Sequence, residues 1–153
     1  MVRLEQYDEH ERRHLLDLPC PTFETNPFVT GIRPSQARVA IISTAGLHRR
    51  SDRPFGLGEA GYRVIPKQVD PADLVMSHVS TNFDRTGFQM DVNMVLPLDR
   101  LKELVEQGDI DSVADYHYSF MGATDPTAME TEARNLAVLL KHDGVNCALL
   151  VPV

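Results

Sequence analysis

Polar side chains that can do chemistry gather where the apolar stretches of the chain end. The residues are Ser43, Thr44 and His48 after the first stretch, Ser77 and His78 after the second, His117 and Ser119 after the third, with Asp84, Asp91 and Asn93 in a loop between them. Because the carboxyl ends of parallel strands meet at one edge of a sheet, we predict that these side chains line one polar cleft. Imidazole groups in such a cleft can act as acid or base, pair with anions or bind a metal.

Each of these residues also has a structural interpretation. A histidine inside a strand is commonly a core residue that hydrogen-bonds to the backbone, serine and threonine after a strand commonly close a turn, and loop acids are commonly solvated. A metal site built from His48, His78, His117 and Asp91 is an alternative that their spacing does not specify, so no metal is predicted. No GxSxG motif is present, which argues against a serine hydrolase of the α/β type.

One textual match to a nucleotide motif occurs and lacks the structural context that the motif needs. Gly56-Leu-Gly-Glu-Ala-Gly61 spells GxGxxG, but it follows a polar loop and precedes an extended run, Tyr62-Arg-Val-Ile65. The dinucleotide fingerprint requires a strand before the glycines and a helix after them. The sequence therefore predicts no nucleotide cofactor, and no other cofactor.

The elements that must position the candidate residues alternate between strands and helices. Residues 38–43 and 112–119 are predicted as strands, and a helical period of leucines with a glycine behind it predicts a helix over 98–108. Asp125-Pro126 and Gly144 mark the ends of a second helix. Ala148-Leu-Leu-Val151 is apolar enough for a central strand that is covered on both faces. Right-handed crossovers between these elements predict an α/β fold, one layered domain with a mostly parallel sheet, Rossmann-like or flavodoxin-like in the broad sense.

The other segments complete one domain over residues 1–153. Residues 1–18 are predicted as an N-terminal helix, 19–36 as an extended arm rich in proline, and 37–153 as the sheet core. Within the core, residues 62–65 read as a short edge strand and 74–79 as another strand of the sheet. Two long polar loops, 48–59 and 80–93, are predicted as functional because long structureless loops are uncommon in compact domains.

Composition excludes several classes of function. The 22 Asp and Glu outnumber the 15 Lys and Arg, so nucleic acid is an unfavourable partner. The charged N-terminus lacks a signal-peptide core, and no apolar run approaches the length of a membrane span. Cys20 and Cys147 lie far apart and outside any CxxC motif, which is typical of reduced thiols in a cytoplasmic protein.

Five phrases of the chain resemble the glycine/sarcosine/betaine/D-proline reductase selenoprotein B family. In order, they are ARVAIISTAGLHRRSDRPF, YRVIP, DPADLVMSHVSTNFDRTGFQMDVNMVLPLDRLKEL, SVADYHYSFMGATDP and LLKHDGVNCALLVPV. The resemblance runs from about residue 19 to residue 153, and HYSFMG is its most specific phrase. It implies reductive cleavage of a carbon–nitrogen bond, with a selenocysteine or cysteine as the nucleophile.

The sequence departs from that family at its end. The family nucleophile opens a cysteine-containing motif directly after the strand that here reads ALLVPV, so the resemblance covers the amino-terminal part of a longer protein. Selenocysteine is encoded by UGA, and we expect that codon after Val153, with a coding region in frame beyond it. A selenol is mostly ionised at neutral pH, whereas a free thiol with a pKa of about 8.5 is not.

The resemblance gives the candidate residues roles. It implies His78 and His117 as supporting acid/base residues of a selenol- or thiol-dependent reductase that acts on a small amine, while the 153-residue chain by itself is expected to be inactive. Two alternatives remain open: a non-enzymatic small-molecule-binding domain and a metal-dependent hydrolase. The expected partners are a small-molecule substrate, a thioredoxin-like or selenoprotein electron donor, and a second copy of the chain.

Overall fold

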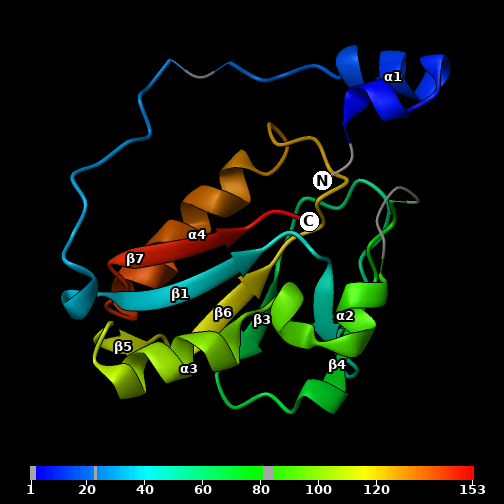
Figure 1. Ribbon diagram of the computed structural model, residues 1–153. Helices are drawn as coiled ribbons and strands as arrows, with labels where there is room; N and C mark the ends of the chain where they lie inside the picture. The colour runs from blue at the N-terminus through cyan, green and yellow to red at the C-terminus, as the bar shows by residue number, and fades with distance from the viewer. Residues whose placement is uncertain (1–2, 23, 81–84) are drawn as a thin grey trace.

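A five-stranded sheet forms the centre of the computed structural model, which describes residues 3–22, 24–80 and 85–153 (Figure 1). Strand β1 (Arg38–Ser43) lies in the middle. On one side it pairs in parallel with β7 (Cys147–Val151), and on the other with β5 (Ser112–Val113) and then β6 (Tyr116–Ser119). An antiparallel strand, β3 (Arg63–Pro66), pairs with β6 at the edge. The predicted α/β fold with a mostly parallel sheet is confirmed.

Two helices cover the two faces of this sheet. Helix α3 (Leu98–Gln107) buries Leu98 and Leu101 in a core that includes Ile41 and Ile65, and Gly108 ends it in the left-handed conformation at φ 78°. Helix α4 (Glu130–His142) buries Leu136 against Tyr118 and Phe120 on the opposite face. The result is a three-layer arrangement in which the helices hold the sheet in place.

The strand predicted over 112–119 is interrupted, because its two halves pair with β1 in different registers. Val113 lies opposite Val39 and Tyr118 lies opposite Ile42, so this side of the ladder contains two residues more than β1 does. Between the two halves the main chain of Asp115 turns toward β3, where its carbonyl accepts the N–H of Lys67 at 2.9 Å. Apolar periodicity does not reveal a break of this kind.

Residues 74–79 were predicted to join the main sheet, and that prediction is wrong. Strand β4 (Leu74–Met76) pairs antiparallel with β2 (Leu47–Arg49) in a separate two-stranded sheet. The start of the predicted loop 48–59 therefore belongs to a strand. The sheet continues through the N–H of Ser77, which donates to the carbonyl of Gly46 at 3.0 Å.

Short helical turns lie on both sides of β4 in the sequence. They are η3 (Pro71–Asp73) just before β4, α2 (Thr86–Met90) and η4 (Val92–Met94). The helix predicted from Asp125 begins at Glu130, since Asp125 instead caps a turn by accepting the N–H of Thr127 at 2.8 Å. In the part of the chain that the structure describes, no helix is both long and apolar enough to cross a bilayer.

Strand β7 differs from its prediction as a central strand. It pairs with β1 and with no other strand among the described residues, so it lies at an edge. Cys147, Leu149 and Val151 pack against the α3-side core, whereas Leu150 on the other face is 67% exposed. Leu150 pairs with Ile42, which packs in the cluster on the α4 side of the sheet. On that side α4 therefore covers β1 but leaves Leu150 of β7 exposed.

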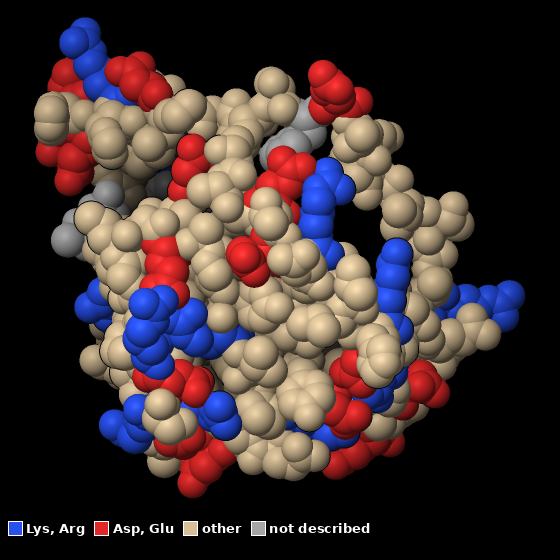
Figure 2. All heavy atoms as spheres, turned by 180° about the vertical axis from the view of Figure 1, so that it is seen from behind, with Lys and Arg blue, Asp and Glu red and all other residues tan. Residues whose placement is uncertain are grey.

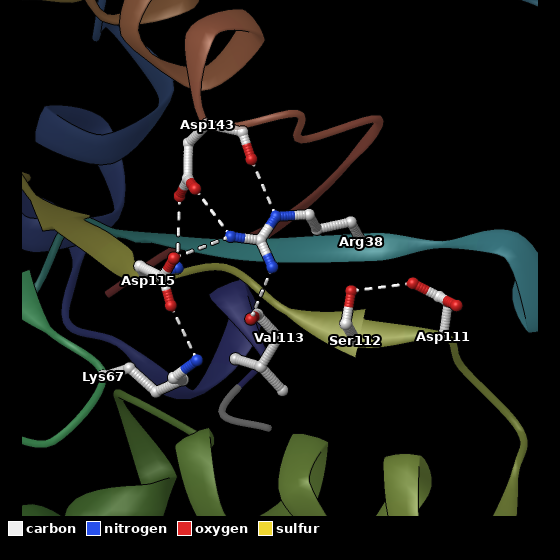
Figure 3. A network of polar contacts seen from close by, with 7 residues as sticks. All are labelled: Arg38, Lys67, Asp111, Ser112, Val113, Asp115 and Asp143. Carbon is white, nitrogen blue, oxygen red and sulfur yellow. Dashed lines mark hydrogen bonds and ion pairs between the residues drawn. The ribbon is translucent and has the colours of Figure 1, made fainter.

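Arg38 fastens the amino-terminal end of the sheet to the end of α4 (Figure 3). Its guanidinium forms ion pairs with the carboxylate of Asp115 at 3.1 Å and with the carboxylate of Asp143 at 2.6 Å. It also donates hydrogen bonds to the carbonyls of Val113 (3.1 Å) and Asp143 (2.7 Å). Lys67 forms a further ion pair with Asp115 at 2.7 Å. The network links β1, β5 and the end of α4 at the sheet edge opposite the candidate site.

The N-terminal segment stands apart from the domain. It comprises η1 (Leu4–Gln6), α1 (Glu9–Leu16), an extended arm and η2 (Pro34–Gln36). Asp8 caps α1 by accepting the N–H groups of His10 and Glu11, both at 2.9 Å, so the predicted 1–18 helix is split before it. Figure 2 shows open space between the extended arm and the body of the molecule.

Candidate functional site

The carboxyl ends of β1 and β7 are joined through Thr44. The N–H of Val153 donates to Thr44 Oγ1 at 2.8 Å, and Thr44 Oγ1 donates to the carbonyl of Val153 at 3.2 Å. The main chain adds a bond from Thr44 N–H to the carbonyl of Val151 at 3.0 Å. Thr44 was predicted as a substrate contact, and its described bonds position the main chain after β7.

Two glycines let the loops after β1 and β6 approach this point. A Cβ on Gly122 would lie 2.5 Å from the carbonyl oxygen of Val153 and 2.9 Å from that of Thr44. Gly46 has a φ of 65°, and a Cβ there would meet the backbone of His78 at 3.1 Å. Neither glycine was predicted as a site residue, although a glycine just after a strand is a sequence signal for close backbone approach.

His78 is the candidate catalytic residue that lies at this junction. Its side chain is buried, and its Nδ1 accepts the N–H of Ser80 at 3.2 Å. Burial lowers the pKa of His78, the main chain of Val153 acts in the opposite direction by hydrogen bonding, and the charge of Arg85 lowers the pKa further. Arg85 also donates to the carbonyl of His78. At neutral pH the ring is therefore a neutral group beside Val153.

His117, the other candidate catalytic residue, lies where the backbone hydrogen bonds between β1 and its neighbours β5 and β6 are interrupted. It is 0% exposed, and its Nδ1 accepts the N–H of Ile41 at 3.0 Å in place of a strand carbonyl. This bond requires that the neutral ring carry its proton on Nε2, for which no hydrogen-bond partner occurs among the described residues. Burial is the main cause that lowers the pKa of His117 to about 4. The bond to Ile41 gives this imidazole a structural function.

The serines of the predicted cleft serve the surrounding loops. Ser43 and Ser119 are both fully buried. Ser43 Oγ accepts the N–H of Ala45 at 3.2 Å, and Ser119 Oγ accepts the N–H of Leu47 at 2.8 Å. These bonds fix the path from β1 into β2, which holds Gly46 against His78.

His48 lies in β2 and forms a pair with Ser77. The Nε2 of His48 is 2.7 Å from Ser77 Oγ, and its Nδ1 is 2.7 Å from the carbonyl of Arg49. The carbonyl can only accept, so Nδ1 carries the proton and Nε2 accepts from the serine hydroxyl. The pair links the two strands of the small sheet next to the junction.

Asp91, the predicted acid that the structure describes, is not gathered with the histidines. Asp91 is exposed and caps η4, where its carboxylate accepts the backbone and side-chain N–H groups of Asn93, both at 2.9 Å. These bonds, the backbone one first, lower the pKa of Asp91. Asn93 in turn bonds to Asp99 in α3. Asp84 lies outside the described residues, and among the described ones no group of three His, Cys, Asp or Glu side chains is arranged for a metal ion.

The structure thus brings Thr44 and His78 together with the main chain of Val153, and two glycines make the approach possible. Ser43, Ser119 and His117 lie beneath this junction as buried supports. We call the set Thr44, Gly46, His78, Gly122 and Val153 the strand-end junction. The junction places one buried, neutral imidazole beside the main chain of Val153, and such a group can act in acid/base chemistry.

Comparison with known proteins gives the same family that the sequence phrases indicate. The family model described as glycine/sarcosine/betaine reductase selenoprotein B matches residues 60–152. The chain is 31% identical over 115 residues to the D-proline reductase subunit gamma of Acetoanaerobium sticklandii, an alignment that covers 73% of this chain and 47% of the relative.

Two further relatives are subunits of reductase complexes. The glycine reductase complex component B subunit gamma of Carboxydothermus hydrogenoformans is 24% identical over 140 residues, and the betaine reductase complex component B subunit beta of Peptoclostridium acidaminophilum is 27% identical over 142. Each alignment covers 88% of this chain and 32% of the relative. The chain therefore spans less than half the length of these curated relatives. No solved structure matches it.

Proposed function

Because the chain belongs to the glycine/sarcosine/betaine reductase selenoprotein B family, we propose that it is the amino-terminal part of a reductase that cleaves a carbon–nitrogen bond of a small amine or amino-acid derivative. The reactive selenol or thiol lies outside residues 1–153, directly after Val153. The subunit names of the relatives support a function within a reductase complex.

The observation that carries this proposal is the convergence of Thr44, Gly122 and His78 on the main chain of Val153. Here two hydrogen bonds and a close glycine contact fix the peptide at the end of β7. Fixing a peptide to this degree is useful if the next side chain must be held against a substrate.

Neither cysteine of the chain fits the role of nucleophile. Cys20 is exposed in the N-terminal arm, and Cys147 is the first residue of β7, where it pairs with Val39. The strand-end junction lies at the other end of β7. A nucleophile at Val153 must therefore come from a residue outside this chain.

The proposed reaction proceeds in two steps. A selenolate or thiolate attacks the carbon that bears the nitrogen, the carbon–nitrogen bond breaks, and the amine leaves with a proton. A second thiol then attacks the selenium or sulfur, the carbon leaves with a proton, and the resulting selenenyl sulfide or disulfide is reduced by a dithiol electron donor. His78 is neutral at pH 7 and its Nδ1 already accepts the N–H of Ser80, so in this proposal the ring stabilises the anion by donating a hydrogen bond from Nε2.

His78 fits the acid/base role better than His117 does. The Nδ1 of each ring accepts a backbone N–H, from Ile41 for His117 and from Ser80 for His78, but His78 is the one that lies beside the main chain of Val153. In the proposed mechanism His117 keeps β1 and β6 in register, and with them the two loops that meet at Val153.

The nucleophile can be tested by comparing three products: the 153-residue chain, a product with a cysteine directly after Val153, and a product with a serine there. We expect the cysteine to react with iodoacetamide at a lower pH than Cys20, and His78→Gln to remove that difference. Dithiol-dependent release of amine from family substrates should occur with cysteine and not with serine. Turnover by the 153-residue chain, or equal pH profiles for the added cysteine and Cys20, would contradict the proposal.

The gene gives an independent check. Sequencing beyond codon 153 should show UGA or a cysteine codon there, followed by an open frame. Any other sense codon at that position would rule out a nucleophile next to Val153 while leaving the family membership unchanged.

A further inference from the structure

The described part of the N-terminal arm contributes no buried side chain to the domain. Every described residue from 3 to 36 is exposed or half-exposed. Phe28 and Val29 are each 88% exposed, although large apolar side chains in an ordered segment usually have a cover. The space-filling view shows the arm standing clear of the body (Figure 2). The described residues of the domain leave these two side chains uncovered.

Strand β7 is a second uncovered feature of the same chain. Its five residues, Cys147–Val151, contain no charge and no proline, and among the described residues it pairs only with β1. Leu150 is 67% exposed on the face that α4 leaves open. Natural sheets protect an edge of this kind with charges, prolines, bulges or a covering segment, because free N–H and C=O groups recruit another strand.

The arm leaves the domain next to the start of β7. The side chain of Asn146 donates to the carbonyl of Gln36 at 3.0 Å and accepts the N–H of Arg38 at 2.8 Å. Residues 28–33 extend for roughly 20 Å, against about 17 Å for the five residues of β7. Pro27, which cannot donate to a ladder, stands just before this stretch, where a proline is tolerated in a strand.

The junction between arm and domain directs the arm outward. Arg33 precedes Pro34 and has an extended backbone, with φ −68° and ψ 132°. A residue before proline is restricted to such conformations, so the chain does not reverse there onto its own β7. Figure 1 shows the arm running from the start of β1 away from the sheet to α1.

We propose that residues 28–33 of one copy add as an outer strand to β7 of a second copy, and that two copies exchange arms in this way. Phe28 and Val29 are neighbours on extended backbone, so they face opposite sides of the added strand. One then covers the face with Leu150 and the other the face with Leu149. A reciprocal exchange buries the apolar side chains of both arms and pairs the free edges of both β7 strands. The product is a dimer with two-fold symmetry.

The test measures assembly and arm burial together on the full chain. Sedimentation equilibrium over a concentration series should give a species of twice the chain mass of 17.1 kDa. Phe28→Asp and Leu150→Asp should each raise the dimer dissociation constant by roughly tenfold or more, since each removes a buried apolar side chain. Leu57→Asp is the matched control: Leu57 is 87% exposed and outside both surfaces, so the constant should not change.

A tryptophan reporter distinguishes arm exchange between two copies from the other ways in which the β7 edge could be covered. The chain contains no Trp, so Phe28→Trp supplies a unique fluorophore. Exchange predicts an emission maximum that moves to shorter wavelength as the protein concentration rises. A monomer at all concentrations overturns the proposal. So does a shift that is independent of concentration, which means that the arm covers its own sheet. A dimer that Leu150→Asp weakens and Phe28→Asp does not, meaning direct pairing of two β7 edges, also overturns it.

Discussion

Thr44 and Val153 are joined through one hydroxyl group that both accepts and donates a hydrogen bond, although the two residues lie 109 positions apart in the sequence. The Oγ1 of Thr44 accepts from the N–H of Val153 and donates to its carbonyl, at 2.8 and 3.2 Å. This residue pair decides where the main chain after β7 lies, and four predictions concern it and the elements that support it.

Removal of the Thr44 hydroxyl should release the end of β7. In Thr44→Val the shape of the side chain is kept and both bonds to Val153 are lost, which costs about 1–2 kcal/mol in the free energy of unfolding. Thr44→Ser keeps the hydroxyl and should retain most of the stability. Urea denaturation measures the difference, and amide hydrogen exchange at Val153 should speed up only in the valine variant. Equal exchange in the two variants would contradict this role of Thr44.

A methyl group at Gly122 should push β6 and β7 apart at the junction. The Cβ of Gly122→Ala would meet two backbone oxygens, those of Val153 and Thr44, and backbone cannot move aside as a side chain does. We expect a loss of roughly 1–3 kcal/mol in unfolding free energy. Gly31→Ala is the control, since nothing lies within 4 Å of a Cβ there, and thermal melting should leave it close to the parent protein.

His117 should make stability depend on pH. Its pKa is about 4 in the folded protein, below the ordinary value of 6.5, so the unfolded chain binds more protons between those values. The stability contributed by neutral His117 is therefore complete above pH 6.5 and is lost as the pH falls toward 4, at up to about 1.4 kcal/mol per pH unit.

The variant His117→Asn tests this origin, because an amide oxygen can accept the N–H of Ile41 without titrating. Urea denaturation from pH 7.5 to 4.5 should show a shallower loss of stability in the variant than in the parent. Burial also lowers the pKa of His78, so some dependence will remain. Identical slopes would mean that His117 does not titrate between the two states.

Arg38 should matter far more than the exposed arginines. Arg38→Lys keeps the charge but loses the planar fork that reaches Asp143, Asp115 and the Val113 carbonyl (Figure 3), and should cost about 1–3 kcal/mol. Arg134→Lys is a fair comparison: its pair with Glu130 is exposed, and it should change stability by less than about 0.5 kcal/mol. Chemical denaturation measures the unfolding free energy of both variants. A larger loss for Arg134→Lys than for Arg38→Lys would contradict this prediction.

The sequence predicts the layers of this fold better than its connections. The helix that ends at Gly108 and the strand at 38–43 follow from local periodicity and capping, and both are confirmed. Strand β7 was placed in the centre of the sheet because its residues are apolar, but composition does not distinguish a covered strand from an exposed edge. Likewise β4 pairs with β2, which lies about 27 residues earlier in the sequence. A periodic pattern within one segment does not specify which strand becomes its partner.

For the candidate site, the sequence found the residue types but not their functions. Thr44 and His78 lie together in the structure, but His78 follows β4 of the separate small sheet and not a parallel strand of the main sheet, as the strand-end rule assumed. The same rule selected His117, whose Nδ1 accepts the N–H of Ile41 where the registers of β5 and β6 against β1 differ. That difference in register becomes apparent only once both strands are paired with β1. Gly46 and Gly122 were missed because a close approach of two loops is a property of three-dimensional packing.

The position of β1 in the sheet has a consequence for how the protein is made. Its partners emerge from the ribosome in the order β5, β6 and then β7, whose pairing with Val39 to Ser43 needs residues 147–151. At a synthesis rate of about 5–20 residues per second, roughly 5–20 seconds pass between β1 and β7. During that interval one edge of β1 has no partner in the nascent chain, and its apolar run from Val39 to Ile42 is a target for a chaperone that binds extended apolar segments.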